Sequence, residues 1–358
     1  MLIYIIFLIL IYLMLLLGKH KIVKGLDFYW LTYFFVFIFS AVRFDVGYDY
    51  TMYYHLIEGD IKFLDDQLNR IAFLSRKLVI LSHDIGFTQF FFIVSSFLII
   101  FLFYKTIRKY SLDFSLSTFI FICFPVFFFQ SLSVIRQYMA IAIVFYGYRY
   151  IKERKILPYF ALVFLATMFH KSAFLALPIY FIYGNFFVNK KIILFLYILG
   201  FFSSNLLGFL VGQLSETYAI YINGRITGEG GNLILIFFQT MGFFLLPIIY
   251  SIKDRNDKEY NFYLLCFYIG LLIWTSLSKY GQAGLRGGLY FISFTILLIP
   301  HLKMKVKQYY FIRQSVFVIC LAFFFLNLYI GSKHKIKDPN MPYQTFFNKK
   351  VNDLKPNE

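Results

Sequence analysis

The sequence predicts an all-α, polytopic membrane protein with about twelve transmembrane helices, because long apolar runs follow one another along most of the chain. The hydrophobic fraction is 60% and the mean hydropathy is +0.70. Phe and Tyr, with 50 and 30 copies, fill these runs and their ends, where aromatic rings tolerate the change from hydrocarbon to lipid headgroups. This composition argues against a soluble globular core.

Each apolar run of roughly 15 to 20 residues is interpreted as one membrane helix. The first run, Leu2 to Leu17, has neither a basic leader nor a small-residue cleavage site, so we expect a retained helix rather than a signal peptide. Several runs are short, which predicts tilted, broken or re-entrant helices among them. The expected spans lie near residues 2–17, 28–42, 87–104, 114–130, 134–150, 156–169, 172–188, 192–211, 233–250, 262–277, 285–300 and 315–330.

The distribution of Lys and Arg predicts the orientation. Alternate links hold most of these residues, whereas many of the others lie in the tail after Ile330, outside the short loops in which the positive-inside rule is reliable. We therefore expect the basic links on the cytoplasmic side and both termini outside. The basic links are 19–24, 105–109, 149–155, 190–191, 253–258 and 303–313.

The net charge of +17 is mainly a topology signal in this interpretation. Anionic lipid headgroups are its natural counterions, and no nucleic-acid partner is expected. Cys123, Cys266 and Cys320 lie inside apolar runs, so they are interpreted as small core residues rather than disulfide partners or metal ligands. The chain has no Gly-rich phosphate loop and no His-Glu-x-x-His zinc motif, which argues against nucleotide consumption.

The expected organisation is one membrane domain over residues 1–331 and an extracytoplasmic tail over 332–358, without internal repeats. The outer face then contains the stretches 43–86, 212–232 and 278–288 and a short link near Arg136. The Lys-rich tail predicts disorder, with contact to anionic lipid or polymer as the alternative.

Two outer stretches carry local patterns. Apolar residues recur at spacings of three and four between Leu64 and Leu81, which predicts an amphipathic helix on the outer leaflet. The loop from Tyr218 to Asn232 holds Tyr221 and Arg225 and, near its end, Gly228, Gly230 and Gly231. This loop is interpreted either as a flap that closes over a ligand or as a plain connector.

Arg43 and Arg136 each stand where an apolar run meets the outer face. Either arginine alone is explained by a side chain that reaches from a helix end to the headgroups. Around Arg136, however, Ala140 and Gly147 continue one helical face with small residues, which predicts packing against neighbouring helices. An arginine on a packed face requires an anionic partner. That partner is either an aspartate in Arg43-Phe44-Asp45-Val46-Gly47-Tyr48-Asp49-Tyr50 or a phosphate-bearing ligand.

Further polar residues outside the two arginines were also considered. His170 lies between two spans on the outer side, as a structural residue or as a base. Arg286 lies beside glycines that permit close backbone approach. Asp45 and Asp49 alone make a thin magnesium site, so no metal is expected. Asp254 and Asp257 are interpreted as part of a solvated charged turn on the cytoplasmic side.

The order of these motifs resembles the EpsG and Wzy-like polysaccharide polymerases of bacterial capsule, exopolysaccharide and O-antigen pathways. The resemblance covers nearly the whole chain. The residues that carry it are Arg43, Gly47, Asp49 and Tyr50; Arg136-Gln137 with Ala140; His170 with Ser172 and Ala173; Arg286 with Tyr290 before Pro300; and Pro342-Tyr343 with Phe346-Phe347.

The resemblance implies that the chain polymerises oligosaccharide repeat units carried on undecaprenyl diphosphate, at the outer leaflet of the bacterial cytoplasmic membrane. It implies no cofactor. The expected partners are the lipid-linked oligosaccharides, membrane lipids, and a flippase and a chain-length regulator of the same pathway. A flippase or transporter of lipid-linked oligosaccharide is the alternative function. A flippase should carry charges deep inside several spans, whereas here the candidates gather at one face, which favours the enzyme.

The same resemblance suggests roles for single residues. A diphosphate leaving group requires charge stabilisation, which is expected from Arg43, Arg136 and Arg286, with Arg225 as a further candidate. The attacking hydroxyl requires a base, and His170, Asp49 and Asp45 compete for that role. Gln137, Tyr50 and Tyr221 are expected to contact other parts of the substrate.

Overall fold

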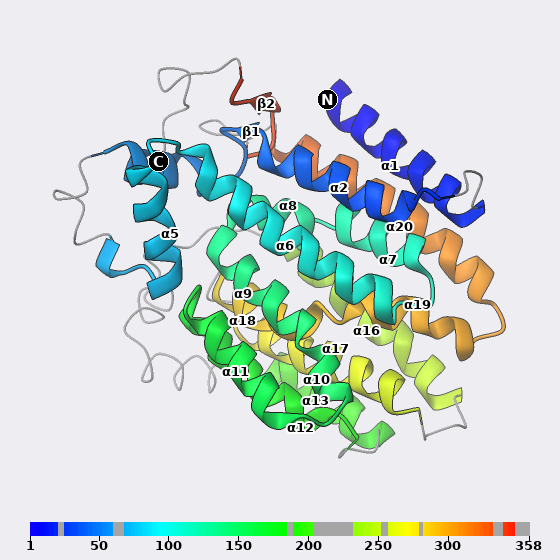
Figure 1. The fold of residues 1–358 in the computed structure, drawn as a ribbon. Helices are drawn as coiled ribbons and strands as arrows, with labels where there is room; N and C mark the ends of the chain where they lie inside the picture. The colour runs from blue at the N-terminus through cyan, green and yellow to red at the C-terminus, as the bar shows by residue number, and fades with distance from the viewer. Residues whose placement is uncertain are drawn as a thin grey trace. The chain divides into compact units, whose positions relative to one another are not determined.

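The computed structural model is almost entirely helical, which confirms the all-α prediction (Figure 1). It describes residues 1–20, 25–59, 68–184, 189–203, 232–251, 257–278, 282–331 and 339–347. The chain divides into two compact units. The first contains residues 1–147, 161–173 and 310–358, and the second contains residues 148–160 and 174–309. The expected boundary at residue 331 stays a prediction.

In the first unit α6 is the central helix, and it packs against α2 and α9, while α1 packs on α2 and α3 on α5. Aspartates cap two of these helices: Asp27 accepts from the Tyr29 and Trp30 amides at the start of α2, and Asp113 accepts from the Leu116 amide at the start of α7. The helices of this unit are α1 (Leu2–His20), α2 (Phe28–Ala41), α3 (Tyr50–Glu58), α5 (Phe73–Asp84), α6 (Gln89–Tyr110), α7 (Phe114–Cys123), α8 (Phe128–Ser133), α9 (Ile135–Tyr146) and α20 (Tyr309–Gly331).

In the second unit α17 (Lys258–Ser276) packs against every other long helix that the structure describes there. Its tightest neighbour is α18 (Gln282–Ile292), because glycines face one another at the crossing. A Cβ atom at Gly288 would lie 2.8 Å from the carbonyl oxygen of Gly270. The other elements are α10 (Tyr148–Lys152), α12 (Ile179–Ile182), α13 (Lys190–Phe202), α16 (Asn232–Ser251), α19 (Thr295–His301) and η4 (Leu302–Met304). Helix α11 (Ile156–Thr167) and η2 (Lys171–Ala176) each run from one unit into the other.

Among the described residues, three helices are long and apolar enough to cross a membrane: Leu2–His20, Gln89–Tyr110 and Tyr309–Ile330. The pair α18 and α19 with η4, bent by 49°, makes a fourth if it is one broken span. Several shorter apolar helices accompany them. The chain is therefore a membrane protein, while the count of about twelve spans and the orientation of the termini stay predictions.

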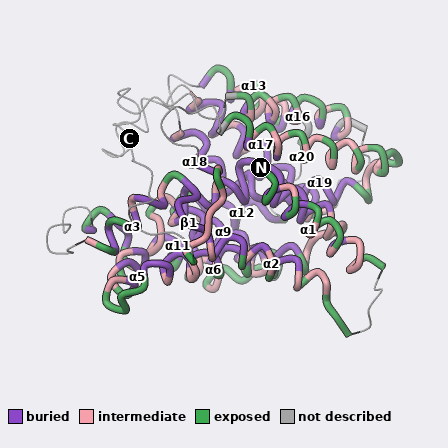
Figure 2. Tube along the Cα trace, turned by 90° about the horizontal axis from the view of Figure 1, so that it is seen from above, coloured by how far each residue is buried: buried purple, intermediate pink, exposed green. Residues whose placement is uncertain are grey.

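Helix α1 has one buried face and one exposed face, and both are apolar. One side, with Tyr4, Phe7 and Ile11, is buried, whereas Ile6 and Ile9 are exposed although they are equally apolar (Figure 2). An apolar side chain gains nothing from exposure to water, so this outer face fits hydrocarbon.

The structure breaks several expected spans. The run 114–130 is divided into α7 and α8, because Pro125 cannot donate a backbone hydrogen bond and forces Phe124 out of the helical conformation (ψ 127). The run 285–300 is divided into α18 and α19, and 172–188 holds only η2 and α12 in its described part.

The single amphipathic helix expected from Leu64 to Leu81 is wrong. Helix α5 begins only at Phe73, after a turn at residues 70–72, and residues 60–67 lie outside the described part. Tertiary hydrogen bonds stabilise the start of α5 at Phe73, since the Leu74 amide donates to the Met168 carbonyl and the Ser75 hydroxyl donates to the Phe169 carbonyl. These bonds override the apolar periodicity.

The expected disorder of the tail is wrong for residues 339–347. There β2 (Gln344–Thr345) pairs antiparallel with β1 (Arg43–Phe44), so that the two strands lie side by side near the start of α1 (Figure 1). The Tyr4 hydroxyl also donates to the Asn340 carbonyl at 2.5 Å. The start of the chain and this part of the tail therefore meet at one end of the first unit.

Candidate functional site

The loop between α2 and α3 carries the Arg-x-x-x-Gly-x-Asp-Tyr string, and its backbone is unusual. Asp45 has φ 52 and Gly47 has φ 102, so the chain passes twice through the left-handed region. At Gly47 only glycine fits, because a Cβ atom would lie 2.0 Å from the Leu132 carbonyl oxygen. The next amide, of Tyr48, donates to the Ser133 hydroxyl at 3.2 Å. The loop is thereby pressed against the junction of α8 and α9.

Arg43 lies beneath this loop and is 1% exposed. Its Nη1 donates to the carbonyl and hydroxyl of Ser40 and to the Ser96 hydroxyl, and its Nε donates to the Val46 carbonyl. The guanidinium also lies 5.3 Å from the centroid of the Phe92 ring. Burial lowers the pKa of Arg43 to about 10, so the group stays charged at neutral pH. Among the described residues, all its hydrogen-bond acceptors are uncharged.

These contacts join α2, α6 and the loop, so Arg43 stabilises the position of the loop relative to the two helices. Tyr50, the first residue of α3, is also buried; its hydroxyl donates to Gln89 Oε1 at 3.1 Å and its ring stacks on Phe92. The Gln89 amide group in turn donates to the carbonyls of Ala41 and Arg43. The string is therefore held from below by one arginine and one glutamine.

Arg136 is placed differently. It is the second residue of α9, is half-buried, and lies with its guanidinium 5.8 Å from the centroid of the Tyr53 ring on α3. Within the described part of the chain, this is its one interaction, with no ion pair and no hydrogen bond. A positive side chain at a helix N-terminus adds to the positive end of the helix dipole. Relative to the described residues, Arg136 is thus a cation whose hydrogen-bond donors face no acceptor.

Asp49 stands at the start of α3, one residue before Tyr50, and is half-buried. Asp45 is buried. Gln137 follows Arg136 on α9 and is also buried. Because Tyr53 is on the same short helix as Tyr50, the Asp49 end of the string and Arg136 belong to one cluster around α3.

His170 lies in the turn after α11 and forms a hydrogen bond between its Nδ1 and the Ser172 hydroxyl at 2.7 Å. The same turn supplies the carbonyls of Met168 and Phe169 to α5, and α5 packs on α3. The first unit thus links the string, Arg136 and the His170 turn through two short helices.

Arg286 belongs to the second unit. It lies in the second turn of α18 and is half-buried. The neighbouring glycines permit close approach, as expected, and at Gly284 and Gly288 the near neighbour is the backbone of α17. A Cβ atom at Gly284 would lie 2.7 Å from the Trp274 carbonyl oxygen. Tyr221 and Arg225 lie outside the described residues.

No group of three or more His, Cys, Asp or Glu side chains that would suit a metal ion is found in the described ranges. The aspartate pair of the string therefore gains no third ligand there.

Comparison with known proteins decides the family. A model of the EpsG family matches residues 26–345, nearly the whole chain. The chain belongs to the EpsG family. Neither the curated proteins nor the solved structures contain a match. EpsG is a Wzy-like family of polysaccharide polymerases, so a role as a polysaccharide polymerase follows from this membership.

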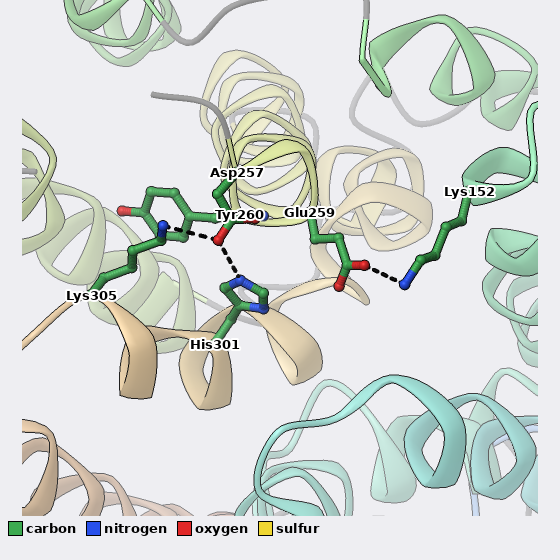
Figure 3. Close-up of polar contacts among 6 residues, drawn as sticks. All are labelled: Lys152, Asp257, Glu259, Tyr260, His301 and Lys305. Carbon is green, nitrogen blue, oxygen red and sulfur yellow. Dashed lines mark hydrogen bonds and ion pairs between the residues drawn. The ribbon is translucent and has the colours of Figure 1, made fainter. Parts of the chain in front are cut away.

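The EpsG match also includes the turn before α17 that contains Asp257. The sequence predicted a solvated turn, but the structure shows that Asp257 is largely buried. Asp257 caps α17 by accepting from the Tyr260 amide, and its other oxygen lies 2.9 Å from both His301 Nε2 and Lys305 Nζ (Figure 3). Its side chain is 16% exposed. Burial raises the pKa of Asp257, but the hydrogen bonds from Tyr260, His301 and Lys305 outweigh it and lower the value to about 2. Asp254 lies outside the described residues.

This cluster ties the start of α17 to the end of α19 in the EpsG chain. Beside it, Lys152 and Glu259 form an ion pair between α10 and α17, at the right of Figure 3. Charge spacing alone favoured a solvated turn because His301 and Lys305 are distant in sequence. Gln89, Ser40 and Ser96 were missed for the same reason, since a polar residue within an apolar run carries no signal of its partner.

Proposed function

We propose that this EpsG protein polymerises oligosaccharide repeat units linked to a polyprenyl diphosphate, of the undecaprenyl type in bacteria, at the outer leaflet of the cytoplasmic membrane. The observation that carries the proposal is the state of Arg136. It is a half-buried guanidinium at a helix N-terminus whose one contact among the described residues is the ring of Tyr53. A diphosphate matches this guanidinium in charge and in hydrogen-bond geometry.

In the proposed reaction the growing chain, on its lipid diphosphate, is the donor. The bond between the anomeric carbon and the diphosphate oxygen breaks, and a bond to the hydroxyl of the incoming lipid-linked unit forms. The electron pair leaves with the diphosphate, where Arg136 stabilises the developing negative charge. The proton of the attacking hydroxyl passes to a carboxylate or an imidazole.

For that base we propose His170 or Asp49, both in the first unit near the α3–α5 pair, with Asp45 as the third candidate. Asp45 is the weakest because it is buried in the strained part of the loop. Arg43 is proposed to support the site rather than to bind the diphosphate, because its side chain is 1% exposed and its Nε and Nη1 already donate to Ser40, Ser96 and Val46. Arg286 and Arg225 stay candidates for further contacts to the lipid-linked substrates.

The orientation is proposed from the basic links: about twelve spans, both termini outside, and the Arg136 cluster on the outer face. An outward site suits the chemistry, because lipid-linked units are polymerised after they have crossed the membrane. A flippase and a chain-length regulator would then act before and beside this protein.

The test uses cells that lack the protein and are complemented with wild type, Arg136→Ala or Arg136→Lys at matched membrane abundance. Arg108→Ala is the matched control, since Arg108 also lies over a tyrosine ring, that of Tyr29, but on a predicted cytoplasmic link. Surface and lipid-linked glycans are resolved by gel electrophoresis. We expect Arg136→Ala to reduce long polymer by a factor of about 100 or more, Arg136→Lys to retain part of it, and Arg108→Ala to resemble wild type.

The location of the single repeat units separates the two functions. Units displayed outside without long polymer support the polymerase, whereas units that stay inaccessible to an external glycan probe indicate transport. Normal polymer length in Arg136→Ala would remove Arg136 from the site.

A further inference from the structure

Residues 339–347, here called the C-terminal strap, form backbone hydrogen bonds to the loop between α2 and α3 at three places. The strap pairs as β2 with β1, with Arg43 opposite Thr345 and Phe44 opposite Gln344. Beyond the strands, the Gly47 amide donates to the Pro339 carbonyl at 2.6 Å and the Phe346 amide donates to the Val42 carbonyl at 3.1 Å. The strap thus supplies backbone partners to the loop between Val42 and Gly47.

One side chain fastens the strap to the helix below it. The Tyr343 ring stacks on Phe39 of α2, with centroids 4.1 Å apart, and its hydroxyl donates to the Phe39 carbonyl at 2.6 Å. Tyr4 of α1 packs edge-on against Tyr343 and donates to the Asn340 carbonyl. A stacked ring and a hydrogen bond to the last turns of α2 fix the strap on a helix rather than on another loop.

The loop depends on such external support because it cannot fold by local rules. Two of its residues are in the left-handed region, and buried backbone groups without partners are costly. Arg43 braces the loop from inside, and the strap holds it from its open edge. Helix α3 begins directly after the loop. Arg43 and the strap therefore together determine where Asp49 lies and where the Tyr53 ring lies against the Arg136 guanidinium.

We propose that the C-terminal strap is a positioning element of the polymerase, and that Tyr343 is its principal positioning residue. This inference rests on the proposed function. It gives a role to the region where the EpsG match ends, at residue 345 within the strap. Tyr343 is not a catalytic residue, because it acts through the loop and not on the substrate.

The experiment compares the full chain with Tyr343→Ala, Tyr343→Phe and a truncation after Phe347. The Phe variant keeps the stack on Phe39 and loses one hydrogen bond. The truncation removes residues 348–358 and leaves the strap intact, so it controls for loss of tail charge. Each protein is purified, its folded fraction is measured by thermal unfolding, and initial rates are measured with lipid-linked repeat units extracted from cells that lack the polymerase.

For Tyr343→Ala we expect kcat per folded molecule to fall tenfold or more, while KM for the lipid-linked units changes less than threefold. Tyr343→Phe should stay within threefold of wild type, and the truncation within twofold. Unchanged kcat per folded Tyr343→Ala molecule would reduce the strap to a stability element and overturn the inference. Wild type that forms no polymer from these units would instead overturn the proposed function.

Discussion

Gly47 and Leu132 touch through their backbones, so that the loop after α2 lies directly on the turn that leads into α9. A Cβ atom on Gly47 would be 2.0 Å from the Leu132 carbonyl oxygen, and φ at Gly47 is 102. This contact brings the Asp49 string to the helix that carries Arg136. The relative placement of the two most polar motifs in the first unit therefore depends on the absence of one side chain.

Gly47→Ala should accordingly destabilise the protein by about 2 to 4 kcal/mol and reduce polymer formation. Thermal unfolding of the purified protein measures the first effect, and gel analysis of surface glycan the second. Gly86→Ala is the control, because Gly86 also has a positive φ, 68, but has no atom within 4 Å of a new Cβ. Its cost should be about 1 kcal/mol. Equal losses in the two variants would show that the Leu132 contact is unimportant.

A second prediction concerns the hydrogen bonds through which Arg43 stabilises the loop. A guanidinium bonds Ser40, Ser96 and Val46 at the same time, whereas an ammonium is a compact donor without that fork. Arg43→Lys should lower the free energy of unfolding by about 2 to 3 kcal/mol, through acceptors left without partners. Ser96→Ala, which removes one acceptor, should cost about 1 kcal/mol. If Lys at 43 is as stable as Arg, the bracing role is wrong.

Helix positions were the part of the fold most open to sequence reasoning. The run 28–42 became α2 with a shift of one residue at its end, whereas the run 87–104 became α6, which starts at Gln89 and continues to Tyr110, six residues beyond the expected end. Apolar length is a local signal for the existence of both helices. The breaks were harder to place. Pro125 is a local signal for the end of α7, but the late start of α5 is set by the carbonyls of Met168 and Phe169, far away in sequence.

The candidate site divides in the same way. The Arg43 string, Arg136 and His170 were found as motifs, and the structure places all three in the first unit. Their partners were not visible, because a strand of two residues such as β2 has no periodicity to detect. The tail was expected to be disordered, yet Tyr343 is held by Phe39. Pairing across three hundred residues leaves no trace in a single sequence.

The α17–α18 crossing gives a third prediction, for the second unit. A Cβ atom at Gly288 would lie 2.8 Å from the Gly270 carbonyl oxygen, and backbone cannot move aside cheaply. Gly288→Ala should cost about 1 to 3 kcal/mol in thermal unfolding. At the adjacent Gly287 the nearest atom is a side-chain methyl of Ile273 at 3.2 Å, so Gly287→Ala should cost less than about 1 kcal/mol. A reversed order would contradict close backbone packing as the reason for the glycine.

The Asp257 cluster predicts a dependence of stability on pH. The folded pKa of Asp257, about 2, lies below the ordinary value of 3.8, because the hydrogen bonds from Tyr260, His301 and Lys305 outweigh the effect of burial, which alone would raise it. The stability that Asp257 contributes is therefore fully present above about pH 5 and is lost progressively as the pH falls through the folded pKa of about 2. Wild type should unfold at a higher temperature than Asp257→Asn at neutral pH, and this gap should close over that acidic window.

Glu259→Gln is the matched control for this measurement, because its ion pair with Lys152 joins the same helix but is more exposed, with 40% of the Lys152 side chain and 26% of the Glu259 side chain accessible. We expect a change below about 1 kcal/mol for it. Thermal unfolding of the three proteins in one detergent between pH 2 and 8 makes the comparison. A gap between wild type and Asp257→Asn that is as large at pH 2 as at neutral pH would mean that the neutral amide disturbs packing, and that the charge of Asp257 is not what holds α17 to the end of α19.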